Sequence, residues 1–198
     1  MMNQNQKLTG KDVIAIGIYS AIYFVLNFVA MMTGFIPLLW MVLPGTVAIL
    51  TGIPFLLMSV KVPKPGAVII MGLITAFLYF VTGQFTVLIL LTMLIACAVS
   101  EAYRYITKYN LKFSNLMVAF ILFSYGMAGS PLALFVYRDS FLAQIGETMS
   151  QEYVAAISSY ITTPMLILLL VSPIAGGFFG ALIAGGIFKK HFKKAGIV

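Results

Sequence analysis

Hydrogen-bonding and aromatic side chains gather near the ends of the apolar stretches of this sequence. Such groups hold a small molecule by hydrogen bonding and stacking, and an apolar cavity with a few placed polar groups is the usual form of such a site. The candidate binding residues are Asn27, Trp40, Tyr79, Gln84, Tyr125, Tyr137, Arg138, Glu147, Glu152, Tyr153 and Tyr160. A second role stays open for each, because tyrosine and tryptophan also anchor proteins at the lipid interface, and an asparagine within a span can bind another helix.

Residues suited to catalysis are missing from the sequence. The lone histidine, His191, lies in Lys-Lys-His-Phe-Lys-Lys and belongs to a basic tail. There is no HExxH motif and no glycine-rich phosphate loop with a lysine, and the single cysteine, Cys97, excludes an intramolecular disulfide and a cysteine-based metal site. No charge lies in the middle of an apolar stretch, as ion pumps generally require. We therefore expect no enzyme activity, no cofactor, no bound metal and no ATP hydrolysis by this chain.

The composition indicates a membrane protein. Hydrophobic residues make up 62% of the 198 residues and charged residues 9%, whereas a soluble domain carries about a quarter charged residues. The mean hydropathy is +1.07. The apolar stretches run for about twenty residues, which is the length of a membrane-spanning helix, and they lack the alternation of barrel strands. The sequence predicts an all-α integral membrane protein in contact with the lipid bilayer.

The basic residues indicate how the chain crosses the membrane. Every Lys and Arg except Arg138 lies in one of the two tails or in two alternate loops, at 61–64 and 104–112. Because positive charge concentrates in cytoplasmic segments, we expect both termini to be cytoplasmic and the number of spans to be even. The net charge of +7 then reflects topology and lipid headgroups, and no nucleic-acid partner is expected.

Six membrane spans in a single domain, residues 1–198, fit this pattern. They are expected at 12–33, 38–60, 67–81, 85–107, 114–135 and 164–188, with one long outer loop at 136–162. Thr9 or Asp12 can cap the first span, which lacks the cleavage site of a signal peptide. Pro44 and Pro54 predict a bent or broken second span. Apolar residues at helical spacing over 141–149 predict a short amphipathic helix lying over the bundle.

Two local patterns complete this outline. Glu101 and Arg104 are three residues apart near the inner end of the fourth span and can form an interfacial ion pair. Thr163 and Pro164 are typical of the N-cap and first helical residue of the last span.

The first span has two distinct faces. Gly17 and Ala21 are four residues apart and leave a smooth groove, which lets another helix approach closely in lipid. Ser20, Tyr23 and Asn27 line up on another side, which suits the interior of a bundle. The last span has a larger smooth face, made by Gly176, Gly177, Gly180, Ala181, Ala184 and Gly185.

The first span resembles a known helix. Gly17-Ile-Tyr-Ser-Ala21-Ile-Tyr-Phe-Val-Leu is similar to the Ala-xxx-Ala motif in the first helix of the S components, the substrate-binding subunits of energy-coupling factor (ECF) transporters. The whole chain is similar to that family in length and number of spans, and within it most resembles the Trep/Strep-type group. The resemblance implies a multi-pass protein of the bacterial plasma membrane.

The resemblance also implies a function. S components capture vitamins, vitamin precursors or metal ions from outside and dock onto a membrane T component coupled to two cytoplasmic ATPases. Ala15, Gly17 and Ala21 would be docking positions. The His-containing N-terminal segment of the nickel and cobalt members is absent, so the implied ligand is a small water-soluble vitamin or precursor, similar to hydroxymethylpyrimidine or pyridoxine.

A different class of function also fits the sequence. The chain could be a non-transport membrane scaffold or assembly factor that uses its small-residue faces only to pack helices. A channel fits less well, because no charged or carbonyl-lined filter motif is present. An S component should purify with a T component and two ATPases and should hold a small molecule, whereas a scaffold should do neither.

Overall fold

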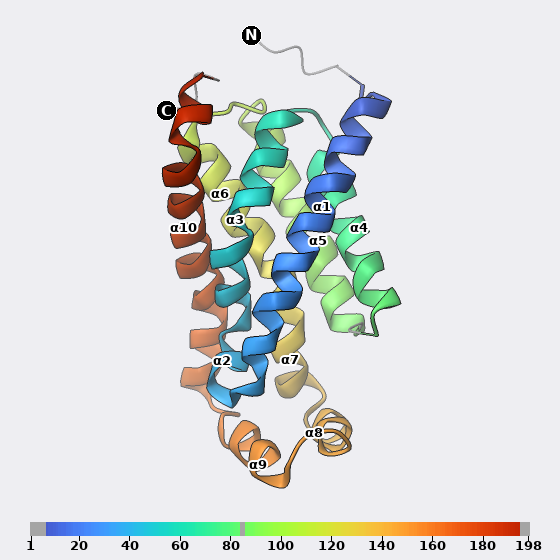
Figure 1. The fold of residues 1–198 in the computed structure, drawn as a ribbon. Coiled ribbons are helices and arrows are strands. Elements are labelled where there is room, and N and C mark those ends of the chain that lie inside the picture. Colours follow the sequence, from blue (N-terminus) through green and yellow to red (C-terminus); the bar gives the residue numbers. More distant parts are fainter. Residues whose placement is uncertain (1–6, 84–85, 195–198) are drawn as a thin grey trace.

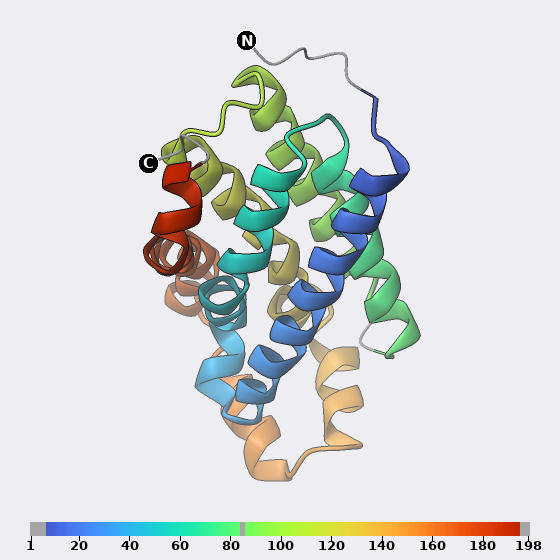
Figure 2. The ribbon, with the colours of Figure 1, turned by 45° about the horizontal axis from the view of Figure 1, so that its top comes forward.

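The computed structural model describes residues 7–83 and 86–194, and this part of the chain is helical without strands. The long helices run side by side as a bundle (Figure 1). The first helix begins and the last helix ends at the same end of the bundle, which we call the terminal end. Two short helices lie at the opposite end, the loop end (Figure 2). The predicted all-α fold class is confirmed.

The chain forms its helices in the following order. They are α1 (Gly10–Met31), η1 (Met32–Phe35), α2 (Pro37–Met41), α3 (Leu43–Lys61), α4 (Ala67–Val81), α5 (Val87–Ile106), α6 (Phe113–Ser124), η2 (Tyr125–Ala128), α7 (Gly129–Val136), α8 (Arg138–Gly146), α9 (Gln151–Ser159) and α10 (Thr163–Lys194). The stretches long and apolar enough to cross a membrane are Gly10–Phe35, Leu43–Lys61, Val87–Ile106, Phe113–Val136 and Thr163–Ile187. The apolar helix α4 is shorter, with 15 residues.

A capping box and a proline explain the start of α1 and the break between α2 and α3. The backbone N–H of Thr9 donates to the Asp12 carboxylate at 2.7 Å, and the Asp12 N–H donates to the Thr9 hydroxyl at 3.4 Å. This capping box starts α1 at Gly10, two residues earlier than predicted. The second span is broken at Val42, with Pro44 in the first turn of α3, so the predicted break is confirmed. Pro54 lies inside α3 without ending it.

The fifth span is not the single α-helix that the sequence suggested. It runs as α6, η2 and α7, and the tighter η2 turn lies where the chain packs closely on α5. A Cβ at Gly129 would collide with the Leu88 carbonyl, and one at Gly126 with the Met93 side chain. The Thr92 hydroxyl also donates to the Gly126 carbonyl at 2.8 Å. This close approach of two helices depends on contacts distant in sequence.

The last span also differs from its predicted limits. The N–H of Leu166 donates to the Thr162 carbonyl at 3.0 Å, so the first turn closes one residue earlier than expected. Thr163 is therefore the first residue of α10 and not its N-cap. The helix continues to Lys194, beyond the predicted end at 188.

Glycines bring α3 and α10 into backbone contact. A Cβ at Gly52 would collide with the backbone of Gly180, and one at Gly176 with the backbone of Gly45. On the other side of α10, a Cβ at Gly177 would meet Ile121 of α6 at 2.9 Å. The larger smooth face predicted for the last span is therefore used for packing within the bundle, as small residues allow in lipid.

The polar face of α1 points into the bundle, as its spacing predicted. Ser20, Tyr23 and Asn27 are each at most 1% exposed. The Tyr23 ring packs edge-on against Phe123 of α6, with ring centroids 5.4 Å apart. Phe55 of α3 lies 4.8 Å from the same Phe123 ring. This aromatic centre fixes the orientation of α1 relative to the rest of the bundle.

Candidate binding cavity

A cavity of about 510 Å³ lies at the loop end, between the bundle and the short helices α8 and α9. Its volume is within the range of small-molecule sites, about 300–1,000 Å³. The walls come from α1, η1, α2, α5, α7, α8, α9, the first residue of α3 and the connecting turns. The lining residues are Phe28, Met31, Met32, Gly34, Phe35, Trp40, Leu43, Gly83, Thr86, Ile89, Ser130, Phe141, Gln144, Ile145, Glu147, Thr148, Met149 and Tyr153.

Two contacts hold the short helices over the cavity. The rings of Trp40 and Phe141 are stacked, with centroids 5.5 Å apart and planes inclined by 19°. The Tyr153 hydroxyl donates to the Gly34 carbonyl at 2.6 Å, which joins α9 to η1. Burial raises the pKa of Tyr153, so its hydroxyl stays protonated and able to donate. The short helix predicted over 141–149 corresponds to α8, and α9 is a second short helix that the sequence did not predict.

Few polar groups face the cavity. Ser130, Gln144 and Glu147 line it, and their side chains have no hydrogen-bond partner among the described residues. The hydroxyls of Thr86 and Thr148 are already bonded to backbone of their own helix or turn. Glu147 is the one charged lining residue in the described part of the chain, so the cavity suits an uncharged or cationic molecule better than an anion.

The predicted binding residues divide into three groups. Trp40, Glu147 and Tyr153 line the cavity. Asn27 and Tyr79 are buried beneath it. The third group does not line it and consists of Tyr125, Tyr137, Arg138, Glu152 and Tyr160.

For two members of the third group, their contacts explain why they lie outside the cavity. The Tyr125 hydroxyl donates to the Leu170 carbonyl at 2.8 Å, so this residue faces α10. Tyr160 packs against a small apolar cluster between α2, α7 and α9. Gln84 lies outside the described residues.

Sequence reasoning missed Ser130 and Gln144. Ser130 lies between Gly129 and Pro131 and looked like part of a helix interruption, while Gln144 lies in the predicted amphipathic segment. The apolar spacing of that segment marked Phe141 and Ile145 as an inward face, and both do line the cavity. The same spacing could have shown that Gln144, next to Ile145, lies near the edge of that face.

Asn27 and Tyr79 are the most unusual polar groups at this end of the bundle. They are 0% and 1% exposed. The Asn27 amide oxygen and nitrogen and the Tyr79 hydroxyl have no hydrogen-bond partner among the described residues. The Tyr23 hydroxyl lies near Asn27 and Thr51, but neither amide atom reaches the distance and angle of a hydrogen bond. Most buried polar groups in proteins are paired.

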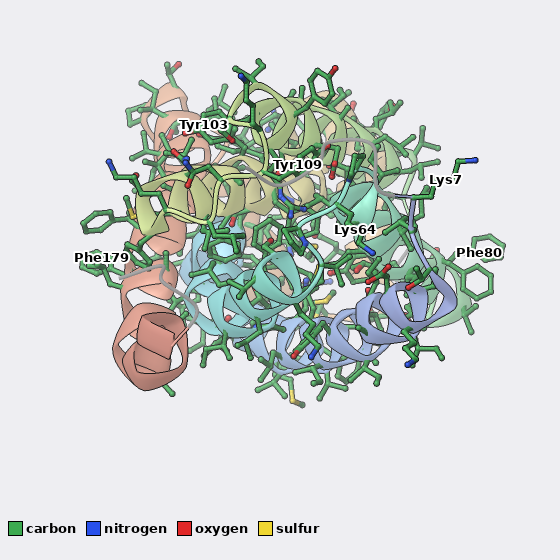
Figure 3. The ribbon with its side chains drawn as sticks, turned by 90° about the horizontal axis from the view of Figure 1, so that it is seen from above. Lys7, Lys64, Phe80, Tyr103, Tyr109 and Phe179 are labelled. Atoms are coloured by element: carbon green, nitrogen blue, oxygen red, sulfur yellow. The ribbon has the colours of Figure 1, made fainter. Side chains whose placement is uncertain are left out.

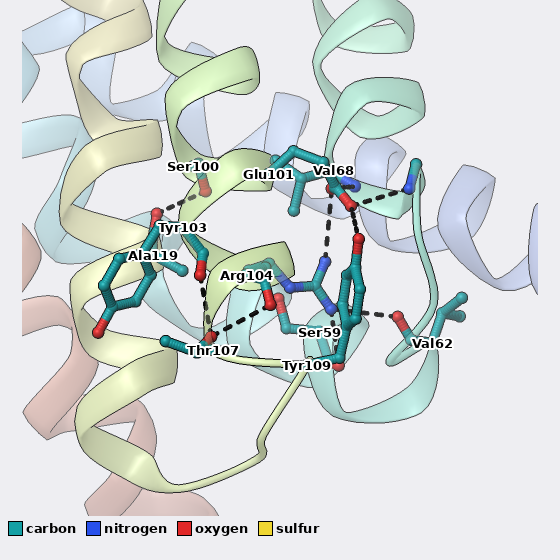
Figure 4. Close-up of polar contacts among 11 residues, drawn as sticks. Ser59, Val62, Val68, Ser100, Glu101, Tyr103, Arg104, Thr107, Tyr109 and Ala119 are labelled. Carbon is teal, nitrogen blue, oxygen red and sulfur yellow. Dashed lines mark hydrogen bonds and ion pairs between the residues drawn. The ribbon is translucent and has the colours of Figure 1, made fainter. Parts of the chain in front are cut away.

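The terminal end holds a buried ionic network (Figure 4). The Glu101 carboxylate accepts hydrogen bonds from the N–H of Gly66 at 2.8 Å, the N–H of Val68 at 3.1 Å and the Tyr109 hydroxyl at 2.9 Å. The Arg104 guanidinium is 3.9 Å from the same carboxylate. Burial, followed by the Glu101 charge, raises the pKa of Tyr109, which keeps its hydroxyl a donor.

Arg104 extends this network to α3. Its guanidinium donates to the carbonyls of Ser59 and Val62, both at 3.3 Å, and is 4% exposed. The pair predicted as an interfacial ion pair is therefore buried and fastens the turn between α3 and α4 to α5. The adjacent Lys64 ammonium lies 2.6 Å from the Asp12 carboxylate, and Figure 3 shows this end of the molecule with Lys64 and Tyr109 labelled. We infer a structural role for these charges.

The small-residue face of α1 is open. Nothing lies within 4 Å of a Cβ added at Gly17, and Ala21 is exposed. Large apolar side chains flank the two small residues, with Ile14 65% and Ile18 56% exposed. Ala15 differs, because it packs against the core cluster, so it does not share the open face with Gly17 and Ala21.

Comparison with known protein families gives a match over most of the chain. Residues 10–194 match the model of the Trep_Strep family, described as a hypothetical bacterial integral membrane protein. The match covers nearly the whole chain, from the start of α1 to the end of α10. Neither the curated proteins nor the solved structures include a match to the sequence or the fold.

Proposed function

We propose a function for this chain, which belongs to the Trep_Strep family of bacterial integral membrane proteins. It is the substrate-capture subunit of an ECF-type importer, and it binds a small water-soluble vitamin or vitamin precursor from outside the cell. It then docks on a membrane T component that works with two cytoplasmic ATPases. The chain itself carries out no chemical step.

The observation that carries this proposal is the cavity roofed by α8 and α9. An assembly factor that only packs helices has no need of a 510 Å³ cavity lined by aromatic rings and a few polar side chains. The stacked rings of Trp40 and Phe141 both line the cavity, and aromatic rings favour stacking of planar groups. A hydroxymethylpyrimidine- or pyridoxine-like ring suits these aromatic residues and the few hydrogen-bonding groups that line the same cavity.

The docking part of the proposal rests on the contrast between two glycine faces. The face of α10 is filled by α3 and α6, whereas the Gly17 and Ala21 face of α1 has no neighbour in the described part of the chain. The basic segments place the terminal end toward the cytoplasm, and Gly17 lies in the half of α1 nearer that end. This is the side from which an ATPase-linked partner acts.

Mass spectrometry of small molecules released from gently purified protein tests the capture function. We expect about one small, ring-containing molecule per protein, and we expect the same compound to raise the melting temperature when added back. Protein with Trp40→Ala should retain much less of it, while Tyr137→Ala, outside the cavity, should retain as much as wild type. Protein that is folded, carries no small molecule and is stabilised by no vitamin or precursor would favour the scaffold function instead.

A further inference from the structure

The strongest unexplained feature of the bundle is the pair of unpaired polar side chains beneath the cavity. Asn27 of α1 and Tyr79 of α4 are fully buried, and three of their polar atoms have no hydrogen-bond partner in the described part of the chain. An unsatisfied buried polar group destabilises a fold, and membrane lipid offers no alternative partner. Leucine and phenylalanine would fill the same volumes without that cost. The polar atoms therefore need an explanation beyond packing.

Their position connects them to the cavity. Asn27 is four residues before Met31, and Tyr79 is four residues before Gly83, and both Met31 and Gly83 line the cavity. Residues four apart share one face of a helix and are separated by about 6 Å along its axis. In α1 the Asn27 side chain thus lies one helical turn inward from Met31 and the cavity wall. Gly83 lies in the turn after α4, which ends at Val81, so Tyr79 is in the last turns of α4, close to the cavity end of that helix. The Tyr79 ring packs on Phe24 of α1, with centroids 5.6 Å apart.

We propose that the ligand site continues inward to Asn27 and Tyr79, and that these two residues form its hydrogen-bonding end. This inference rests on the proposed capture function and deepens it. The Asn27 amide offers one donor and one acceptor side by side, and the Tyr79 hydroxyl can donate or accept. The ligand edge that pairs with them carries an adjacent donor and acceptor, as an aminopyrimidine edge does.

The charges around the pair define the ligand further. The Tyr23 hydroxyl lies near Asn27 and Thr51, and none of these three side chains carries a charge at neutral pH. A charged ligand group placed there would be buried without a counter-charge, which is strongly unfavourable. The inner end of the ligand is therefore an uncharged ring edge. Any charged or solvent-exposed substituent lies at the other end, toward Glu147 and the roof.

Two substitutions at the pair and one matched control test this inference. Asn27→Leu and Tyr79→Phe remove the polar atoms and keep the approximate volume. Ser59→Ala is the control, because the Ser59 hydroxyl is also buried and unpaired but lies in the last turns of α3 at the terminal end. The probes are hydroxymethylpyrimidine and pyridoxine, with pyridoxal phosphate as an anionic comparison. Titration calorimetry and the amount of small molecule retained through purification are the two readouts.

We expect each variant to melt at or above the wild-type temperature without ligand, because an unsatisfied buried group has been removed. Affinity for the better probe, or the retained amount, should fall about a hundredfold for Asn27→Leu and about tenfold for Tyr79→Phe, with no change for Ser59→Ala. Retention equal to wild type in both pair variants overturns the inference and leaves the capture function standing. Wild type that binds neither probe and retains no molecule overturns both. Stronger binding of pyridoxal phosphate than of pyridoxine would contradict the orientation inferred here, in which the outer end of the ligand lies toward the Glu147 carboxylate.

Discussion

At the scale of single residues, the hydrogen bond from the Tyr153 hydroxyl to the Gly34 carbonyl ties the roof helix α9 to η1. Tyr153→Phe removes its bond to the Gly34 carbonyl and keeps the ring in the cavity wall. One hydrogen bond contributes about 0.5–1.5 kcal/mol, so we expect ligand to dissociate roughly two to ten times faster. Tyr125→Phe is the matched control, since its hydroxyl bonds to Leu170 outside the cavity. Equal dissociation rates in the two variants would contradict a role for this bond in closing the site.

Glu101 is the residue on which the terminal end depends most. It accepts three hydrogen bonds and faces Arg104 in a buried setting. Removing its charge leaves the guanidinium buried without a counter-charge, and breaking such a pair costs about 3–5 kcal/mol. Glu101→Gln should therefore lower the melting temperature in detergent clearly, while the protein that remains folded still binds ligand. Glu152→Gln, at an exposed position, should melt as wild type does. If Glu101→Gln melted at the same temperature as wild type, the network would not be what fastens the turn between α3 and α4.

At the scale of elements, the two glycine faces should respond differently to the same kind of change. Gly52→Ala places a methyl group against the backbone of Gly180, so α3 and α10 must separate. Overpacking of this kind costs about 1–3 kcal/mol, and thermal unfolding should detect it. Gly186→Ala provides the comparison, because nothing lies within 4 Å of its added methyl. If both variants were equally stable, the close α3–α10 contact would not be required.

Larger substitutions on the open face of α1 separate docking from capture. Gly17→Leu and Ala21→Leu point into open space and should leave folding and ligand retention unchanged. They should prevent co-purification with the T component and the ATPases and abolish uptake by cells. Gly186→Leu, at an open position near the same end, is expected to leave both intact. Uptake that survives the two α1 substitutions would rule out docking through this face.

The sequence predicted the helices better than the breaks and tight turns within the spans. The charge distribution and apolar lengths indicated the helical stretches, and Pro44 marked the break in the second span. The η2 turn and the early start of α10 were not predicted, because they depend on how α5 packs on Gly126 and Gly129 and on a single backbone bond to Thr162. The contacts of Gly126 and Gly129 join residues far apart in the chain. The start of α10 differs from a common capping pattern by one position.

At the scale of the whole molecule, the cavity lies at the loop end of the bundle and the open α1 face lies nearer the terminal end. Three of the predicted binding residues line the cavity, because aromatic and polar side chains at helix ends do tend to face a site there. Tyr137 and Arg138 do not, since the direction of an exposed side chain in a long loop is set by how that loop folds. The sequence could not show that α8 and α9 would form a roof with two separate helices.

The central claim is that this protein captures a small molecule at the loop end, and the most direct test is mass spectrometry of protein purified from membranes without denaturation. We expect one ring-containing, water-soluble compound per protein, retained by wild type and by Tyr137→Ala and released from Trp40→Ala. Folded wild-type protein without any bound compound, and not stabilised by vitamins or their precursors, would contradict the claim.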